Sequence, residues 1–193
     1  MKIVPIYIVF EASILLEETE KANDLIQRTI GKFRTNPYDL EMVSLGIMSY
    51  QAEVSIIRKL TPIIDYGQIN INQLFQPFDS LELGRPNFEK MIDALIVEIS
   101  EISRKESPWG PNVIIIANDY KLSELYKGLS QLHAQCDSVE VCIINNIGGV
   151  KSDLFLKVES LDCIENIGYS LVQFYDGDLD NYYHKNKVRL REI

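Results

Sequence analysis

The stretch Val4-Pro5-Ile6-Tyr7-Ile8-Val9-Phe10, followed directly by Glu11-Ala12-Ser13, decides the fold that the sequence predicts. It is a continuous apolar run rich in β-branched and aromatic residues, which is typical of a strand buried on both faces of a mostly parallel sheet. A carboxylate and a hydroxyl stand at the carboxyl end of this strand, just before a helical pattern begins. Open α/β sheets bind ligands at that edge, so candidate functional residues are expected there.

Strand and helix patterns alternate along the rest of the chain. Segments with apolar residues at helical spacing are expected to be helices, and they cover residues 15–33, 88–102 and 122–132. Short helices are also expected around residues 71–75 and 154–158. Apolar runs are expected to be strands at residues 42–50, 52–60, 113–117 and 139–144, of which the first two form an antiparallel hairpin. The prediction is a single α/β domain over residues 1–193. Its central sheet is doubly wound and mostly parallel, with one antiparallel edge strand and helices on both faces.

The composition limits the classes of function. The chain has 193 residues and a net charge of −9, which argues against nucleic-acid binding because that needs a basic face. No apolar run approaches the ~20 residues of a membrane span, so no membrane insertion is expected. The N-terminus shows no signal-peptide pattern, and the three cysteines form no C-x-x-C pair. These features predict a cytoplasmic protein with reduced thiols.

Common catalytic and nucleotide-binding motifs are absent from the sequence. It contains no G-x-x-x-x-G-K-[ST] phosphate loop, no G-x-G-x-x-G turn after the first strand, no G-x-S-x-G elbow and no H-E-x-x-H. The two histidines are His133 and His184, and neither lies at the carboxyl end of a predicted strand. A catalytic triad is therefore not expected.

Several segments, in order, resemble the von Willebrand factor A (VWA) domain family. The first strand with Glu11-Ala12-Ser13 is similar to the VWA first strand, which ends in D-x-S-x-S. Similar in order are the helix-to-strand connection, the second strand, the exit of the third strand and the strand that ends in T-D-G, at residues 34–43, 45–50, 59–62 and 110–119. The likeness covers about the first three quarters of the chain. It is closest to the small bacterial VWA proteins associated with tellurium resistance (the TerY group).

The resemblance implies a metal-ion-dependent adhesion site (MIDAS), in which Asp, two Ser, a Thr and a second Asp hold Mg²⁺ and a partner's carboxylate completes the shell. The five equivalent positions in this chain are Glu11, Ser13, Leu15, Pro86 and Asn118. Leu15 and Pro86 offer no side-chain oxygen, and Asn118 is a neutral amide, whereas Mg²⁺ demands near-octahedral oxygen ligands. We therefore expect a degenerate MIDAS without metal or other cofactor. The alternative is a cation site rebuilt from Glu11, Ser13 and Asp119.

The function expected from this resemblance is non-enzymatic protein–protein interaction in a bacterial stress-response or tellurium-resistance type system, with partners that include phosphatase- or kinase-like proteins. The expected partner face is the carboxyl edge of the sheet, with Gln51, Asp79, Arg85, Asn87 and Asp119. Two residues at this edge, Asn118 and Asp119, are also expected to cap a helix that begins at Tyr120, and Asn87 the helix before it.

Two alternatives remain open. One is a ligand-binding VWA domain that depends on Mg²⁺. The other is a small phospho-ligand-binding or hydrolytic α/β enzyme, in which Asp119 or Glu11 would be the general base.

Overall fold

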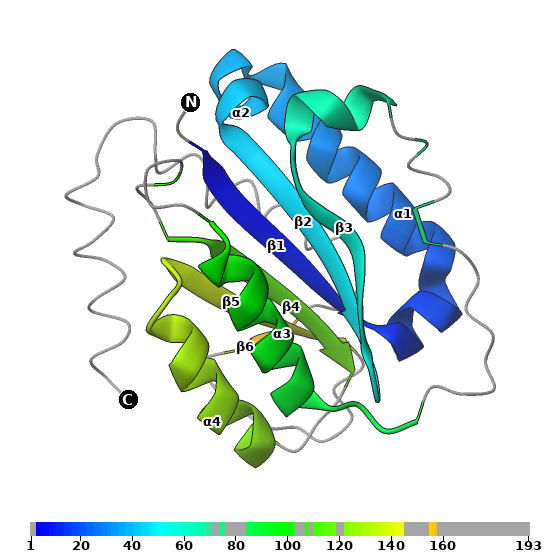
Figure 1. The fold of residues 1–193 in the computed structure, drawn as a ribbon. Coiled ribbons are helices and arrows are strands. Elements are labelled where there is room, and N and C mark those ends of the chain that lie inside the picture. The colour runs from blue at the N-terminus through cyan, green and yellow to red at the C-terminus, as the bar shows by residue number, and fades with distance from the viewer. Residues whose placement is uncertain are drawn as a thin grey trace.

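The sheet is the centre of the fold in a computed structural model that describes residues 3–68, 70, 74–75, 84–102, 107, 110–118, 122–144 and 155–157. Within these residues six strands form one sheet in the order β3-β2-β1-β4-β5-β6 (Figure 1). They are β1 (Val4–Glu11), β2 (Val43–Tyr50), β3 (Val54–Pro62), β4 (Asn112–Asn118), β5 (Ser138–Ile144) and β6 (Phe155–Lys157). Only β2 and β3 pair antiparallel among these strands, with β3 at the edge. The predicted fold class is confirmed.

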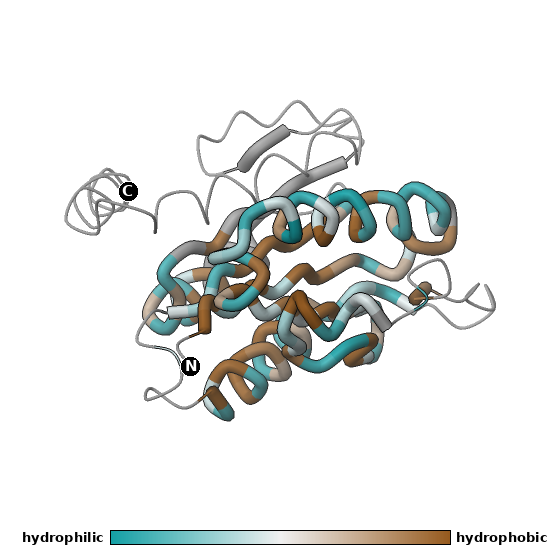
Figure 2. The backbone as a smooth tube through the Cα atoms, turned by 90° about the horizontal axis from the view of Figure 1, so that it is seen from above, coloured by the Kyte–Doolittle hydropathy of each residue, from teal (hydrophilic) through white to brown (hydrophobic). Residues whose placement is uncertain are grey.

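Helices pack on both faces of the sheet. They are α1 (Ala12–Thr35), α2 (Pro37–Met42), the 3₁₀ helix η1 (Ile63–Gln68), α3 (Phe88–Ser100) and α4 (Leu122–His133). Side chains of β1 alternate between the two faces, so that Ile6, Ile8 and Phe10 pack with α1 while Tyr7 and Val9 pack with α3 and α4. Figure 2 shows the mainly hydrophobic strands between the two helical layers. Among the described residues, no helix is long and apolar enough to cross a membrane.

The chain leaves β1 and β4 in opposite directions. From β1 it passes through α1 and α2 to β2 on one side, and from β4 it passes through α4 to β5 on the other. The two strands are parallel neighbours, paired from Ile6 opposite Asn112 to Phe10 opposite Ile116. Their carboxyl ends therefore form the topological switch point of the sheet, where open α/β folds bind ligands.

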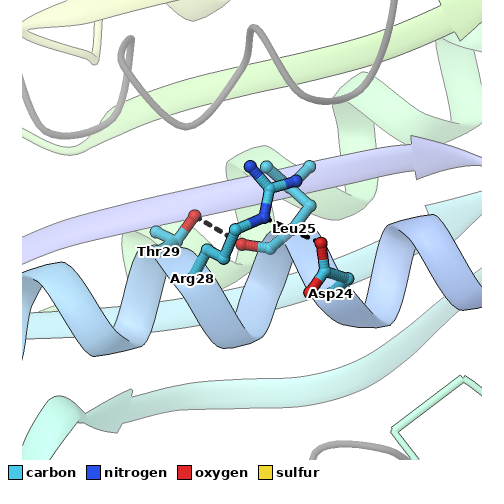
Figure 3. Close-up of polar contacts among 4 residues, drawn as sticks. All are labelled: Asp24, Leu25, Arg28 and Thr29. Carbon is cyan, nitrogen blue, oxygen red and sulfur yellow. Dashed lines mark hydrogen bonds and ion pairs between the residues drawn. The ribbon is translucent and has the colours of Figure 1, made fainter.

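One turn of α1 shows the polar contacts on the exposed and the buried side of this helix (Figure 3). On the outer side, Arg28 Nε lies 2.8 Å from Asp24 Oδ2, an ion pair between residues four apart. On the inner side, Thr29 is buried and its hydroxyl donates to the carbonyl oxygen of Leu25 at 2.8 Å. The polar group of a buried threonine is thus satisfied by the helix itself.

A kink near its start gives α1 a separate first turn. The backbone at Glu18 is not helical (φ −132°, ψ 38°). Next to it, the Thr19 hydroxyl donates to the carbonyl of Leu15, which in a regular helix accepts the backbone N–H of residue 19. Insertion of a side chain into the backbone ladder is a recognised cause of helix kinks. The turn before the kink carries two of the MIDAS-equivalent residues, Ser13 and Leu15.

The structure corrects two local predictions. Residues 34–43 were expected to connect a helix directly to the strand that starts at residue 42, but Pro37–Met42 form helix α2, with Asn36 Oδ1 accepting from the Tyr38 backbone N–H at 3.0 Å. The helix expected around residues 154–158 was wrong where the structure describes it, because Phe155–Lys157 is strand β6, paired in parallel with β5. A short apolar run fits either period, and here sheet pairing prevails. The helix expected at 71–75 lies largely outside the described residues.

Candidate functional site

Three polar side chains meet at the switch point and form a closed ring of hydrogen bonds. The Asn118 side-chain amide donates from Nδ2 to Ser13 Oγ at 2.9 Å, and the Ser13 hydroxyl donates to Glu11 Oε1. The other carboxylate oxygen, Glu11 Oε2, accepts the backbone N–H of Asn118 at 2.9 Å. The ring therefore joins the end of β1, the first turn of α1 and the end of β4.

The length of the glutamate side chain explains this ring. Backbone pairing of β1 with β4 ends at Phe10 and Ile116. Beyond this pair, a side chain has to accept the backbone N–H of Asn118 on β4. The Glu11 carboxylate reaches across and accepts a backbone N–H of the neighbouring strand. Glu11 is 1% exposed. Burying a carboxylate is unfavourable unless hydrogen-bond donors replace the lost water. Here the Ser13 hydroxyl and the Asn118 backbone N–H offset that desolvation cost.

Among the described residues, which do not include Asp119, this arrangement does not fit a magnesium site. Both Glu11 oxygens accept hydrogen bonds, and the amide nitrogen of Asn118, rather than its oxygen, faces Ser13. The single Ser13 proton is directed at Glu11, so Ser13 accepts from Asn118 and the direction of the whole ring is fixed. Among the described residues, no group of three or more His, Cys, Asp or Glu is placed to hold a metal ion. The described part of this donor set supplies one carboxylate, whereas the MIDAS of the VWA domains that the sequence resembles uses two.

The other two MIDAS-equivalent residues, Leu15 and Pro86, take no part in this hydrogen-bonded ring. Leu15 is 0% exposed and belongs to the core cluster between α1 and the sheet. Pro86 is half-buried in the loop before α3 and has no side-chain donor or acceptor. Neither residue can provide a side-chain oxygen ligand.

Gln51 at the end of β2 holds the loop that precedes α3. Its side chain donates from Nε2 to the carbonyl oxygen of Gly84 at 3.1 Å, and its backbone carbonyl oxygen accepts the backbone N–H of Asn87 at 2.7 Å. Gln51 is 8% exposed, so most of its side chain is used inside the protein rather than offered to a partner. The loop Gly84–Asn87 is thereby fixed at both ends to one residue.

The remaining predicted face residues differ in their exposure and role. Arg85 is exposed between the two points at which Gln51 holds the loop. Asn87 caps α3, as predicted, because its Oδ1 accepts the backbone N–H of Lys90 at 3.0 Å. Asp79 and Asp119 lie outside the described residues, as does the predicted helix start at Tyr120. The described part of that helix begins at Leu122.

Two features of this edge were missed from the sequence. Lys90 on α3 forms an ion pair with Glu53 in the turn between β2 and β3, with Nζ 2.5 Å from Oε1. Gly84 has φ 59°, and a Cβ there would lie 2.8 Å from the Cβ of Ala52 in the same turn. The Gly-Arg-Pro-Asn sequence signals a turn, but only the tertiary structure shows that it packs against residues 51–53.

The comparisons with known proteins identify the fold but no family. No protein-family model matches the chain, and no curated protein is similar to it in sequence. Proximal thread matrix protein 1 from the mussel byssus is similar in structure, with a TM-score of 0.59 and 14% identity over 89% of this chain and 47% of that chain. The same mussel protein with a zinc-occupied MIDAS motif matches with a TM-score of 0.56, 13% identity and the same coverage.

A third similar structure is an aerotolerance-related membrane protein from Bacteroides fragilis NCTC 9343. It matches with a TM-score of 0.47 and 15% identity over 81% of this chain and 77% of that chain. This chain spans about half the length of the mussel protein, 47% of it. At such low identities the likeness shows the fold alone. The chain has a VWA-like α/β fold.

Proposed function

We propose that the chain is a non-enzymatic protein–protein interaction domain whose MIDAS-equivalent site works without metal. The observation that carries this proposal is the closed ring of Glu11, Ser13 and Asn118 at the switch point. In this ring, hydrogen bonds to the Glu11 carboxylate take the place of metal–ligand bonds. The edge keeps a fixed shape without a cation, which is what a docking surface requires.

Three titratable groups support the non-enzymatic part of the proposal. Glu11, one of the two candidate general bases, is buried and both of its oxygens accept hydrogen bonds. Burial raises the pKa of the Cys136 thiol to about 12, so the nucleophilic thiolate is scarce at neutral pH. Burial also lowers the pKa of His133, which is the last residue of α4 and lies away from the carboxyl edge of the sheet.

The proposed setting comes from the sequence resemblance. The segments similar to the tellurium-resistance-associated VWA proteins support a cytoplasmic bacterial protein of a stress-response or tellurium-resistance type system. In that setting the partners are other proteins, including phosphatase- or kinase-like ones. The Mg²⁺-dependent docking domain is the competing candidate, because the mussel protein of similar fold has a form with a zinc-occupied MIDAS motif.

The metal-free site predicts that divalent cations leave the thermal stability unchanged. We expect the melting midpoint to shift by less than about 1 °C between EDTA and millimolar Mg²⁺ or Mn²⁺. A site occupied at about 100 times its Kd would instead stabilise the fold by about 2.7 kcal/mol, or roughly 5–10 °C for a chain of this size. Differential scanning fluorimetry measures the shift. A clear rise that disappears in Glu11→Ala would establish the rebuilt cation site instead.

The docking function predicts that a partner protein contacts the carboxyl edge of the sheet. A photo-crosslinking amino acid at Glu89, which is exposed in the first turn of α3, is expected to give discrete adducts in the native host. The matched control is Tyr38 on α2, which is 69% exposed at the opposite end of the sheet and is expected to give none. Gel shifts and mass spectrometry of the adducts, with and without EDTA, provide the measurement. Adducts from Tyr38 alone would place docking elsewhere.

A further inference from the structure

We propose that edge strand β3 is protected against pairing with a second copy of this chain, and that the exposed charge of Lys59 is the group that prevents this pairing. The inference goes beyond the proposed docking function and does not depend on it. Three observations carry it: the position of β3 at the edge of the sheet, irregular pairing that is confined to this strand, and positive charge without acidic residues along it.

Strand β3 lies at one edge of the sheet, and no other strand among the described residues pairs with its outer side (Figure 1). All of its residues are half-buried or exposed, whereas every residue of its neighbour β2 is buried. The strand begins with the apolar run Val54-Ser55-Ile56-Ile57, and Ile56 is 44% exposed. A β-branched run at a sheet edge is a template on which another chain can add a strand. Without protection, β3 would therefore extend the sheet into a second molecule.

Irregular pairing distinguishes β3 from the interior strands. The β1–β2 and β4–β5 pairs run from end to end without a register shift, whereas the β2–β3 register shifts twice. At these places two steps along β2 correspond to three along β3, and then one step corresponds to two. β3 therefore has one extra residue between Thr61 and Arg58 and another between Arg58 and Ile56. Such bulges twist an edge strand away from the straight path that a second strand needs.

The charges on β3 all have one sign. The strand contains Arg58 and Lys59 and no acidic residue, although the chain has a net charge of −9. A second copy would bring the same two charges. Antiparallel strands lie about 4.8 Å apart with about 3.4 Å per residue, so a register centred near Arg58 and Lys59 places like charges within a Debye length of about 8–10 Å. Like charges on facing strands destabilise the pair.

Lys59, rather than Arg58, is the charge that an incoming strand would meet. Arg58 is half-buried, its Nε donates to Thr61 Oγ1 at 3.3 Å, and its guanidinium carbon lies 6.0 Å from the ring centroid of Tyr66. The fold thus holds Arg58 against its own strand and η1. Lys59 is exposed. Its ammonium group would lose water if a second strand covered it, and lysine is a residue with which natural sheets protect their edges.

The test measures self-association of the full chain in Lys59→Val, because valine removes the charge and continues the β-branched run. Analytical ultracentrifugation from about 10 µM to about 1 mM is expected to show species larger than those of the wild type, with a share that rises with concentration. Lys59→Arg, which keeps the charge, is expected to behave as the wild type. Hydrogen exchange followed by mass spectrometry locates the contact, since backbone amides of residues 54–60 are expected to exchange about tenfold more slowly in the associated variant. If Lys59→Val does not fold by circular dichroism, Lys59→Thr replaces it, because threonine is neutral, β-branched and more polar.

Lys21 provides the matched control, because its side chain is 58% exposed but lies on helix α1. Lys21→Leu removes the same charge and exposes an apolar side chain, and it is expected to sediment as the wild type. Equal association of Lys21→Leu and Lys59→Val would overturn the proposal, because the effect would then come from added apolar surface in general. A folded neutral variant at Lys59 that does not associate would overturn it too. So would concentration-dependent protection of residues 54–60 in the wild type, because the edge would then pair despite Lys59.

Discussion

Replacing Leu15 with serine is expected to lower the free energy of unfolding by about 3–5 kcal/mol. By the sequence resemblance to VWA domains, Leu15 corresponds to a metal-binding serine of those domains, so this substitution introduces that serine. In this chain, however, the side chain is 0% exposed and packs in the core cluster beneath α1. The serine would leave a cavity and bury a hydroxyl among apolar groups, and both effects destabilise the fold. Urea unfolding followed by circular dichroism measures the change.

Leu16 offers a control one residue further along the same helical turn. It is 37% exposed, so Leu16→Ser loses little buried area while it changes the helix propensity by the same amount. We expect this control to cost less than about 1 kcal/mol. Equal losses for the two variants would mean that Leu15 is not the core residue described here, and the position would again be open to a ligand role.

The fold was predictable where the sequence pattern is long or unmistakable. The apolar runs of β1 and β4 and the 3.6-residue period of α1 and α3 identified the central elements within one to three residues at their ends. The six-residue helix α2 is too short to show a period, although Asn36-Pro37 is a helix-start signal, because Asn caps the helix and Pro occupies its first position. The three-residue strand β6 is too short for its apolar residues to distinguish a strand from a helix, and it depends on pairing with β5.

The location of the candidate site at the carboxyl edge of the sheet was predictable from the sequence, but the hydrogen bonds among its residues were not. Glu11, Ser13 and Asn118 were expected at the same edge because carboxyl ends of parallel strands meet there. That they bond to one another depends on β1 and β4 being neighbours, which the sequence does not specify. The same limit applies to Gln51, whose hydrogen bond to Gly84 spans 33 positions along the chain. Such contacts follow from the path of a loop, which residue patterns do not determine.

The Glu11 ring gives the second large expected effect. Glu11→Ala is expected to destabilise the protein by about 2–3 kcal/mol, because it leaves the backbone N–H of Asn118 and the hydroxyl of Ser13 without their acceptor. The loss of a buried charge offsets part of this cost. Glu53→Ala is the control, since that carboxylate is 80% exposed and forms a surface ion pair. We expect it to change the unfolding free energy by less than about 1 kcal/mol, as exposed pairs do. Chemical unfolding of both variants is the measurement.

A double-mutant cycle shows whether the three residues act as one unit. If they do, Ser13→Ala costs about 1 kcal/mol in the wild type but much less in the Glu11→Ala background, with a coupling energy of about 0.5–2 kcal/mol. Additive losses would contradict the ring.

Glu11→Asp tests the length of the side chain separately from its charge, because it keeps the carboxylate but has one methylene fewer, as in the aspartate of the VWA domains that the sequence resembles. The Glu11 carboxylate now joins the Asn118 backbone N–H on β4 to the Ser13 hydroxyl on α1. A side chain too short to span both groups leaves one buried donor unpaired, which costs about 1–3 kcal/mol. Full stability in Glu11→Asp would show that the ring does not depend on the longer side chain of Glu11.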